Sequence, residues 1–234
     1  MCFRMSSPPV KCEGKRYLTF GSYPTDDVIK ELETFDLNIW RRYDFRTKFD
    51  VFQHTKNGIK QSTHQNTYTL PLCWLLNSWT PYNHVTVYHF TDCKSLYHWA
   101  EFLHNILIKQ GIEDGIIVKA MFAKLLPKKQ IPSHTDASPT LQFAHRYHWV
   151  ISSDQSVEFT INGKSSHWPD GHIYELNNIL EHSVTNPSDT ERIHFIMDIM
   201  PNKYITAGVT HKDVSRSCYL SHQNVFIDNL EGVI

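Results

Sequence analysis

Residues 141–200 carry the clearest structural pattern in the chain and read LQFAHRYHWVISSDQSVEFTINGKSSHWPDGHIYELNNILEHSVTNPSDTERIHFIMDIM. Short apolar and β-branched segments alternate there with three turn signals, which are Asn162-Gly163, Pro169-Asp170-Gly171 and Asn186-Pro187-Ser188-Asp189. Several short strands at regular spacing, with turns between them, are typical of a double-sheet jelly roll or a barrel. We therefore predict a mainly β domain.

Helices are expected in front of this block. Residues 26–35 form the first, with Thr25 as its N-cap and two aspartates at the positive end of the helix dipole. Residues 92–110 form the second, because apolar side chains recur at helical spacing before a glycine that can end the helix. Residues 115–127 are expected to form a buried strand. Further short strands are expected over residues 38–45, 48–54 and 63–72.

The length of 234 residues and the hydrophobic content of 41% suit one large domain. We expect a loose N-terminal segment (1–15), a single catalytic domain (16–201) with its jelly-roll core at about 116–200, and a tail (202–234) packed on the domain. The net charge is −1, which provides no electrostatic footprint for nucleic acid or for an anionic membrane.

The five cysteines are scattered and include no Cys-x-x-Cys pair, so neither a zinc ribbon nor a disulfide framework is indicated. The first residues lack the apolar run of a secretory signal. No stretch approaches the roughly 18 to 20 consecutive apolar residues of a membrane span. These features predict a soluble cytoplasmic protein with free thiols.

The segment IPSHTDASPT (131–140) places a histidine and a carboxylate two residues apart, at His134 and Asp136. In an extended chain residues i and i+2 share a face, so both side chains can reach one point. His182 is the candidate third ligand, since four short strands fit between it and Asp136 and can bring the chain back. Two histidines and one carboxylate form the metal site of non-haem Fe(II) oxygenases.

Arg192 lies ten residues after His182 and opens the last strand of the block. An arginine that points into a barrel needs a partner, and a ligand carboxylate would supply a bidentate one. Arg146 and His148, two apart on an earlier strand, form a possible second polar cluster. Each residue alone also fits an ordinary surface or core position, so the order and spacing of the whole set carry the interpretation.

Between residues 122 and 200 the chain resembles the aspartyl/asparaginyl β-hydroxylase family of Fe(II)/2-oxoglutarate-dependent oxygenases, which includes L-proline cis-4-hydroxylases. The shared pieces are LLPKKQIPSHTD, HRYHWVI, HWPDGHIYELNNILEHSVTN and ERIHFIMDI. The resemblance implies a double-stranded β-helix, a jelly roll of the cupin-like kind, with flanking helices. It also implies an oxidoreductase that needs Fe(II), 2-oxoglutarate and O2.

The resemblance implies roles for particular residues. His134, Asp136 and His182 would hold Fe(II) as ligands at the catalytic centre, and Arg192 would bind the distal carboxylate of 2-oxoglutarate. Some relatives have glycine at the position of Asp136 and bind iron with two histidines only, whereas a full triad is expected here.

Arg146 and His148 match the arginine and histidine that line the co-substrate pocket in this family. One position departs from the pattern. The β-hydroxylases carry a serine that helps to hold the distal carboxylate, and Ala123 occupies that position here. The pocket therefore needs another hydroxyl or a water, or it holds the co-substrate more weakly.

The expected reaction hydroxylates an unactivated carbon of an amino acid or peptidyl residue (Asp, Asn or Pro-like) and releases succinate and CO2. A small molecule or short peptide is the expected substrate. Arg41, Arg42 or Arg46 is a candidate partner for a substrate carboxylate, but these arginines fit ordinary solvated loop charges better. Three alternatives stay open: a Zn²⁺- or Mn²⁺-dependent hydrolase or isomerase on the same scaffold, a non-catalytic binding or sensor module, and a structural jelly-roll protein.

Overall fold

The computed structural model describes residues 8–35, 39–40, 66–75, 84–136 and 138–215. Most of the strands predicted between residues 38 and 65 lie outside these ranges, as does the last part of the predicted tail. None of the helices in the described ranges has the length and apolar character that a transmembrane helix needs.

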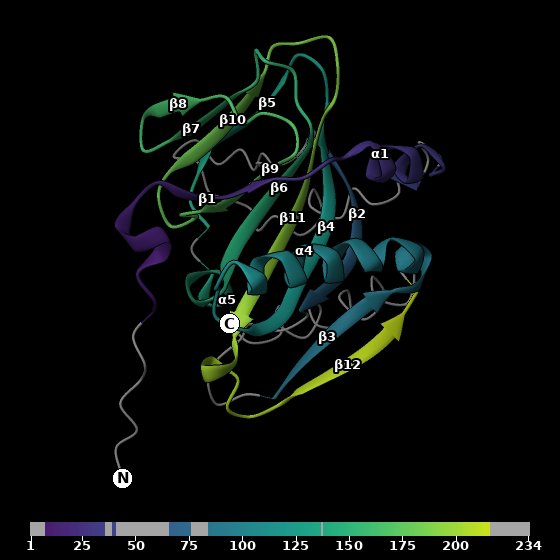
Figure 1. The fold of residues 1–234 in the computed structure, drawn as a ribbon, viewed down its shortest axis with the longest axis vertical. Coiled ribbons are helices and arrows are strands. Elements are labelled where there is room, and N and C mark those ends of the chain that lie inside the picture. Colours follow the sequence, from purple (N-terminus) through teal and green to yellow (C-terminus); the bar gives the residue numbers. More distant parts are fainter. Residues whose placement is uncertain (1–7, 36–38, 41–65, 76–83, 137, 216–234) are drawn as a thin grey trace, which may run out of the picture.

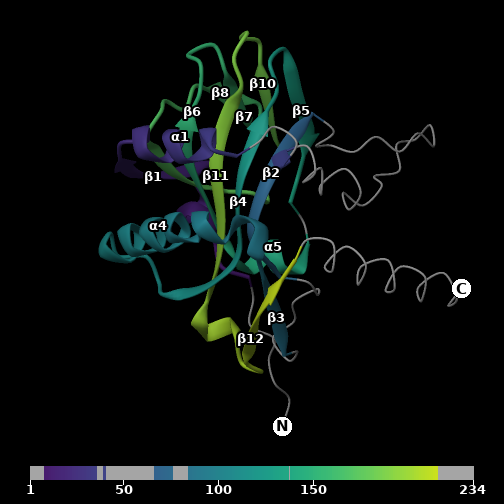
Figure 2. The same ribbon diagram turned by 90° about the vertical axis from the view of Figure 1, so that its right-hand side faces the viewer.

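Two sheets form the body of the molecule, and they face each other in Figure 2. The larger has eight strands in the order β1 (Tyr17–Ser22), β9 (His172–Leu176), β6 (His145–Ser152), β11 (Arg192–Pro201), β4 (Gly115–Leu125), β2 (Thr67–Leu75), β3 (Val85–Phe90) and β12 (Val209–Val214). The smaller has four, in the order β5 (Lys129–His134), β10 (His182–Asn186), β7 (Glu158–Ile161) and β8 (Lys164–Ser166). The prediction of a mainly β, jelly-roll fold is confirmed.

Two helices, α1 (Asp26–Glu33) and α4 (Tyr97–Lys109), lie on the other side of the large sheet from the small sheet (Figures 1 and 2). The longer, α4, packs its aromatic side chains on Trp149 of β6, with ring centroids 6.0 Å away for Trp99 and 5.6 Å for Phe102. The remaining described helices are α5 (Pro139–Phe143) and three 3-10 turns at Lys11–Gly14, Thr91–Leu96 and Asn202–Tyr204.

The alternation along β6 explains how one strand serves two environments. Tyr147, Trp149 and Ile151 belong to the apolar core under α4. Val150, on the opposite face, belongs to the second core between the two sheets. Arg146 and His148 share that inner face because side chains of a strand alternate with period two. The strand thus supports the helix with one face and lines the space between the sheets with the other.

Several local predictions are confirmed and others need correction. The hairpin between β7 and β8 turns at Asn162 and Gly163, whose φ angles of 49° and 70° are typical of a type I′ turn. The strand predicted from residue 141 is wrong at its start, because residues 139–143 form α5. Ser138 accepts a hydrogen bond from the Leu141 amide there, and a proline opens the helix.

The predicted helices also differ in detail. Thr25 precedes α1, but its side chain makes no capping hydrogen bond. The helix predicted over residues 92–110 begins as a 3-10 turn and becomes α-helical only at Tyr97. Within the predicted tail, β12 pairs in parallel with β3 and extends the large sheet.

Candidate metal site

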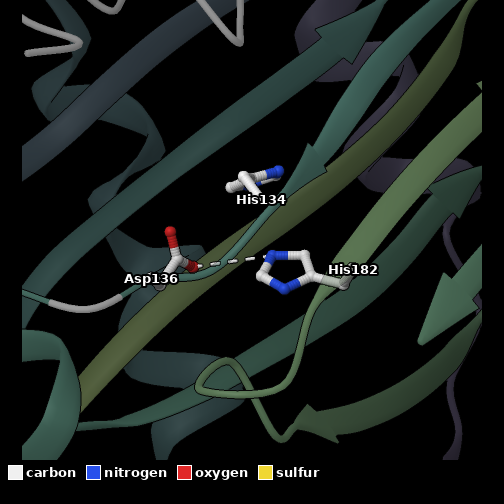
Figure 3. Close-up of side chains that lie close together, drawn as sticks. All are labelled: His134, Asp136 and His182. Carbon is white, nitrogen blue, oxygen red and sulfur yellow. Dashed lines mark ion pairs between the residues drawn. The ribbon is translucent and has the colours of Figure 1, made fainter. Parts of the chain in front are cut away.

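Two neighbouring strands of the small sheet bring the two candidate histidine ligands together. His182 of β10 is the antiparallel partner of His134 of β5, and their ring centroids are 4.3 Å apart. Asp136 follows the end of β5, where its backbone N–H donates to the Asn178 carbonyl at 2.9 Å. Asp136 Oδ2 then lies 3.7 Å from His182 Nε2. The three side chains point toward one another in Figure 3.

These three residues form a cluster that suits a metal ion. One ligand atom from each lies within 4.8 Å of the others, and no other His, Cys, Asp or Glu group among the described residues meets this condition. The chain thereby places two imidazole nitrogens and one carboxylate around one point. A divalent transition metal accepts this donor set, and the three ligands leave positions open for further ligands.

Each histidine side chain is held by a hydrogen bond to a nearby backbone carbonyl. His134 Nδ1 lies 2.8 Å from the Pro132 carbonyl oxygen, and His182 Nδ1 lies 2.9 Å from the Leu180 carbonyl oxygen. A carbonyl only accepts a hydrogen bond, so Nδ1 carries the proton in both rings and the lone pair resides on Nε2. The hydrogen bond at Nδ1 fixes the tautomer and the ring orientation that a metal-binding histidine needs.

The charges around Asp136 keep it ionised. Burial would raise the pKa of its carboxyl, but Arg146 and the two neighbouring histidines lower that pKa to about 2. Burial also lowers the pKa of His182 to about 4, so its imidazole is neutral near pH 7. An ionised carboxylate and a neutral imidazole are the forms that coordinate a metal.

Arg146 connects the carboxylate of the cluster to a second one. Its Nη1 donates to Asp136 Oδ2, while Nε and Nη2 each lie 2.7 Å from an oxygen of Asp198. Asp198, on β11, is 1% exposed. Burial would raise the pKa of Asp198, but the Arg146 guanidinium more than offsets it, so the pKa is lowered. The two carboxylates thus fix the guanidinium, and the guanidinium fixes one oxygen of Asp136.

Arg192 lies on the same inner face of β11 and is 2% exposed. Its Nη2 is 2.6 Å from His194 Nδ1. Because a guanidinium only donates, His194 Nδ1 accepts and the proton of this ring resides on Nε2. Burial, with the adjacent Arg192 charge, lowers the pKa of His194 well below its usual value, which keeps the ring neutral. His148 Nδ1 lies 3.3 Å from the same His194 nitrogen.

One pocket between the sheets joins most of the predicted site residues. It is lined by His134, Arg146, His148, His182 and Arg192, together with Ala123. The structure therefore brings the two predicted histidine ligands and the predicted co-substrate residues to a single cavity, and Asp136 reaches this group through His182 and Arg146. The arginines predicted to meet a substrate carboxylate, at 41, 42 and 46, lie outside the described residues.

Asp198 is the site residue that sequence analysis did not single out. Asp198 shares a strand face with Arg192 by period two, so both side chains point into the interior. Its pairing with Arg146 depends on the β11–β6 register, in which the two residues are direct neighbours. A second buried charge on the face of Arg192 was the available signal, because a buried carboxylate requires a cationic partner.

Comparisons with known proteins identify a family for most of the chain. A family model described as aspartyl/asparaginyl beta-hydroxylase matches residues 46–201. No curated protein matches the chain. Similar solved structures include an oxidoreductase of the 2OG-Fe(II) oxygenase family from Burkholderia pseudomallei (11% identity, TM-score 0.48, 89% of this chain and 98% of that chain). Another is a predicted oxalate decarboxylase from Thermotoga maritima (17% identity, TM-score 0.31, 43% and 72%).

Proposed function

The chain belongs to the aspartyl/asparaginyl beta-hydroxylase family, and on this basis we propose that it is an Fe(II)- and 2-oxoglutarate-dependent dioxygenase. The convergence of His134, Asp136 and His182, with both Nδ1 atoms held by backbone carbonyls, is the observation that carries the proposal. Fe(II) bound there would supply the oxygen chemistry, in which the metal and not the protein performs the difficult step. The same family membership favours an enzyme over a sensor module or a structural protein.

The protein residues bind and orient the reactants. Arg192 has the burial and the planar donor set to bind the distal carboxylate of 2-oxoglutarate. The overall reaction takes up O2, converts 2-oxoglutarate to succinate and CO2, and leaves the second oxygen atom as a hydroxyl on the substrate carbon. Apolar side chains, among them Phe159 and Ile196, line the pocket and limit the access of water.

His148 and Arg146 have different parts in this proposal. Both line the pocket, as the family resemblance implies. The Arg146 guanidinium, however, already donates to Asp136 and Asp198 through Nε, Nη1 and Nη2. We infer that Arg146 acts mainly by holding the metal-binding carboxylate, whereas His148 is the neighbour of the co-substrate.

The proposed substrate is a free amino acid or a residue of a short peptide, hydroxylated at an unactivated carbon. The family description names aspartyl and asparaginyl residues, so aspartate and asparagine, free and in short peptides, are the first substrates to test. A metal-dependent hydrolase on the same ligands is the alternative. A hydrolase has no need of a buried arginine that can bind a co-substrate carboxylate, so Arg192 favours the oxygenase.

The test is the conversion of 2-oxoglutarate to succinate by purified protein with Fe(II) and a panel of amino acids. We expect succinate with Fe(II) in air and none with Zn²⁺. His134→Ala should abolish the activity, while Asp213→Asn, a half-exposed carboxylate on β12, should keep it. Tight metal binding with no succinate under any condition, including uncoupled turnover, would contradict the oxygenase and favour the hydrolase.

A further inference from the structure

The pocket contains a buried hydroxyl that the proposed function has not used. Thr67, the first residue of β2, is 1% exposed and lines the pocket together with Arg192 and Ala123. Its Oγ1 has no hydrogen-bond partner among the described residues. A buried hydroxyl without a partner costs free energy, so its presence beside a ligand pocket points to a bound group that satisfies it.

Strand register places Thr67 at the level of Arg192. Leu125 of β4 pairs with Thr67 on one side and with Arg192 on the other. The hydroxyl and the guanidinium therefore come from the two strands that flank β4, at the same level of the sheet, and both residues line the pocket. Ala123 lies two residues before Leu125 on β4, and it pairs with Thr69 and with His194.

The chemistry of the pocket beside Thr67 and Arg192 suits a carboxylate. Arg192 supplies a buried positive charge, and a carboxylate accepts two parallel hydrogen bonds from a guanidinium. A carboxylate has more lone pairs than the guanidinium can occupy, so it can also accept from a hydroxyl. Ala123 offers no donor there. The apolar residues that line the pocket, including Leu176 and Val184, offer none either.

We propose that the Thr67 hydroxyl donates a hydrogen bond to the distal carboxylate of 2-oxoglutarate, and so supplies from β2 the donor that Ala123 lacks on β4. The inference rests on the proposed function, because it assigns a further residue to the same co-substrate. Thr67 is a binding residue in this account and takes no part in the chemistry at the metal.

The experiment measures the dissociation constants of 2-oxoglutarate and of 2-oxobutanoate, which lacks the distal carboxylate, for the Mn²⁺-loaded protein by titration calorimetry. Thr67→Val keeps the shape and removes the hydroxyl, so we expect 2-oxoglutarate to bind roughly ten- to hundredfold more weakly, as for a lost hydrogen bond to a charged group. The affinity for 2-oxobutanoate should not change. Thr67→Ser should bind 2-oxoglutarate as the unmodified protein does.

Thr69→Val is the matched control, since it makes the same replacement two residues along β2 at a residue equally buried. Thermal unfolding of all variants would verify that they fold. An unchanged 2-oxoglutarate affinity in Thr67→Val, or an equal loss for both ligands, would overturn the role of Thr67. If 2-oxoglutarate does not bind even to the unmodified protein, the proposed function itself fails. Arg192→Met would then have no effect on 2-oxoglutarate binding.

Discussion

Arg146 holds Asp198 through two hydrogen bonds, from Nε to Oδ1 and from Nη2 to Oδ2, and each is 2.7 Å long. The third donor, Nη1, reaches Asp136. The orientation of the carboxylate in the candidate metal site therefore depends on a buried aspartate that lies on another strand. Replacing a group that orients a metal ligand typically weakens metal binding by about ten- to hundredfold.

Asp198→Asn should weaken metal binding although it changes none of the three proposed metal ligands. The amide keeps one acceptor oxygen and turns an NH2 donor toward the other Arg146 N–H, so the guanidinium loses its fixed position beside Asp136. We expect roughly ten- to hundredfold weaker binding of Mn²⁺ or Co²⁺, and a loss of about 3 kcal/mol in the free energy of unfolding. Metal titration and urea denaturation measure these two quantities.

Asp213→Asn provides the control for this prediction. Asp213 is also paired with a cation, Lys94, at 2.7 Å, but both side chains are more than half exposed. Exposed ion pairs contribute little, so stability and metal affinity should stay close to those of the unmodified protein. Equal metal affinities in Asp198→Asn and Asp213→Asn would show that Asp198 does not position the site.

The buried His194 predicts a dependence of stability on pH in the metal-free protein. In the folded state its pKa is lowered well below the usual value by burial, whereas in the unfolded chain it takes up a proton below about pH 6.5. The unfolded state then binds more protons, so the free energy of unfolding falls as the pH decreases below 6.5. One such group contributes up to about 1.4 kcal/mol per pH unit.

His194→Gln should reduce this slope, which urea denaturation at pH 7, 6 and 5 would measure. Some slope should remain, since burial also lowers the pKa of His182, to about 4. Asp213→Asn is again the control, because hydrogen bonding and charge from Lys94 lower the pKa of Asp213 and keep its titration below this pH range. The same slope in His194→Gln and the unmodified protein would contradict a neutral, buried His194.

Gly115→Ala tests the register of β4 against β11. Gly115 pairs with Pro201, and an added Cβ would lie 2.8 Å from the carbonyl carbon of Met200 and closer still to its oxygen. Backbone must shift to relieve this contact, so we expect a loss of about 3 kcal/mol. Gly111→Ala has open space around its Cβ but a φ of +88°, and should cost only about 1 kcal/mol. Equal losses would contradict this pairing.

The sequence was sufficient for the residues that recur in short, regular patterns. His134 and Asp136 are two residues apart in an extended segment, and His182 follows after a block of recognisable strands. Local patterns of this kind can be predicted without the tertiary structure, because the strand itself sets the direction of its side chains. The hairpin at Asn162-Gly163 was predictable for the same reason, since its turn type demands those residues.

Relationships between distant strands were not predictable in this way. Arg146 and Asp198 meet because β6 and β11 are neighbours in one particular register, and no local pattern specifies that register. Thr67 and Arg192 are related only through the strand between them. The strand β12 was missed since its residues alternate weakly and lie at the edge of the sheet.

The central claim is that His134, Asp136 and His182 hold an Fe(II) ion to which 2-oxoglutarate binds. Anaerobic addition of 2-oxoglutarate to the Fe(II)-loaded protein tests it most directly, because 2-oxoglutarate bound to the iron would give a weak visible absorption band. We predict that the band appears in the unmodified protein and is lost in His134→Ala. Absence of the band from a folded protein that has bound Fe(II), or an equal band in His134→Ala, would contradict the account.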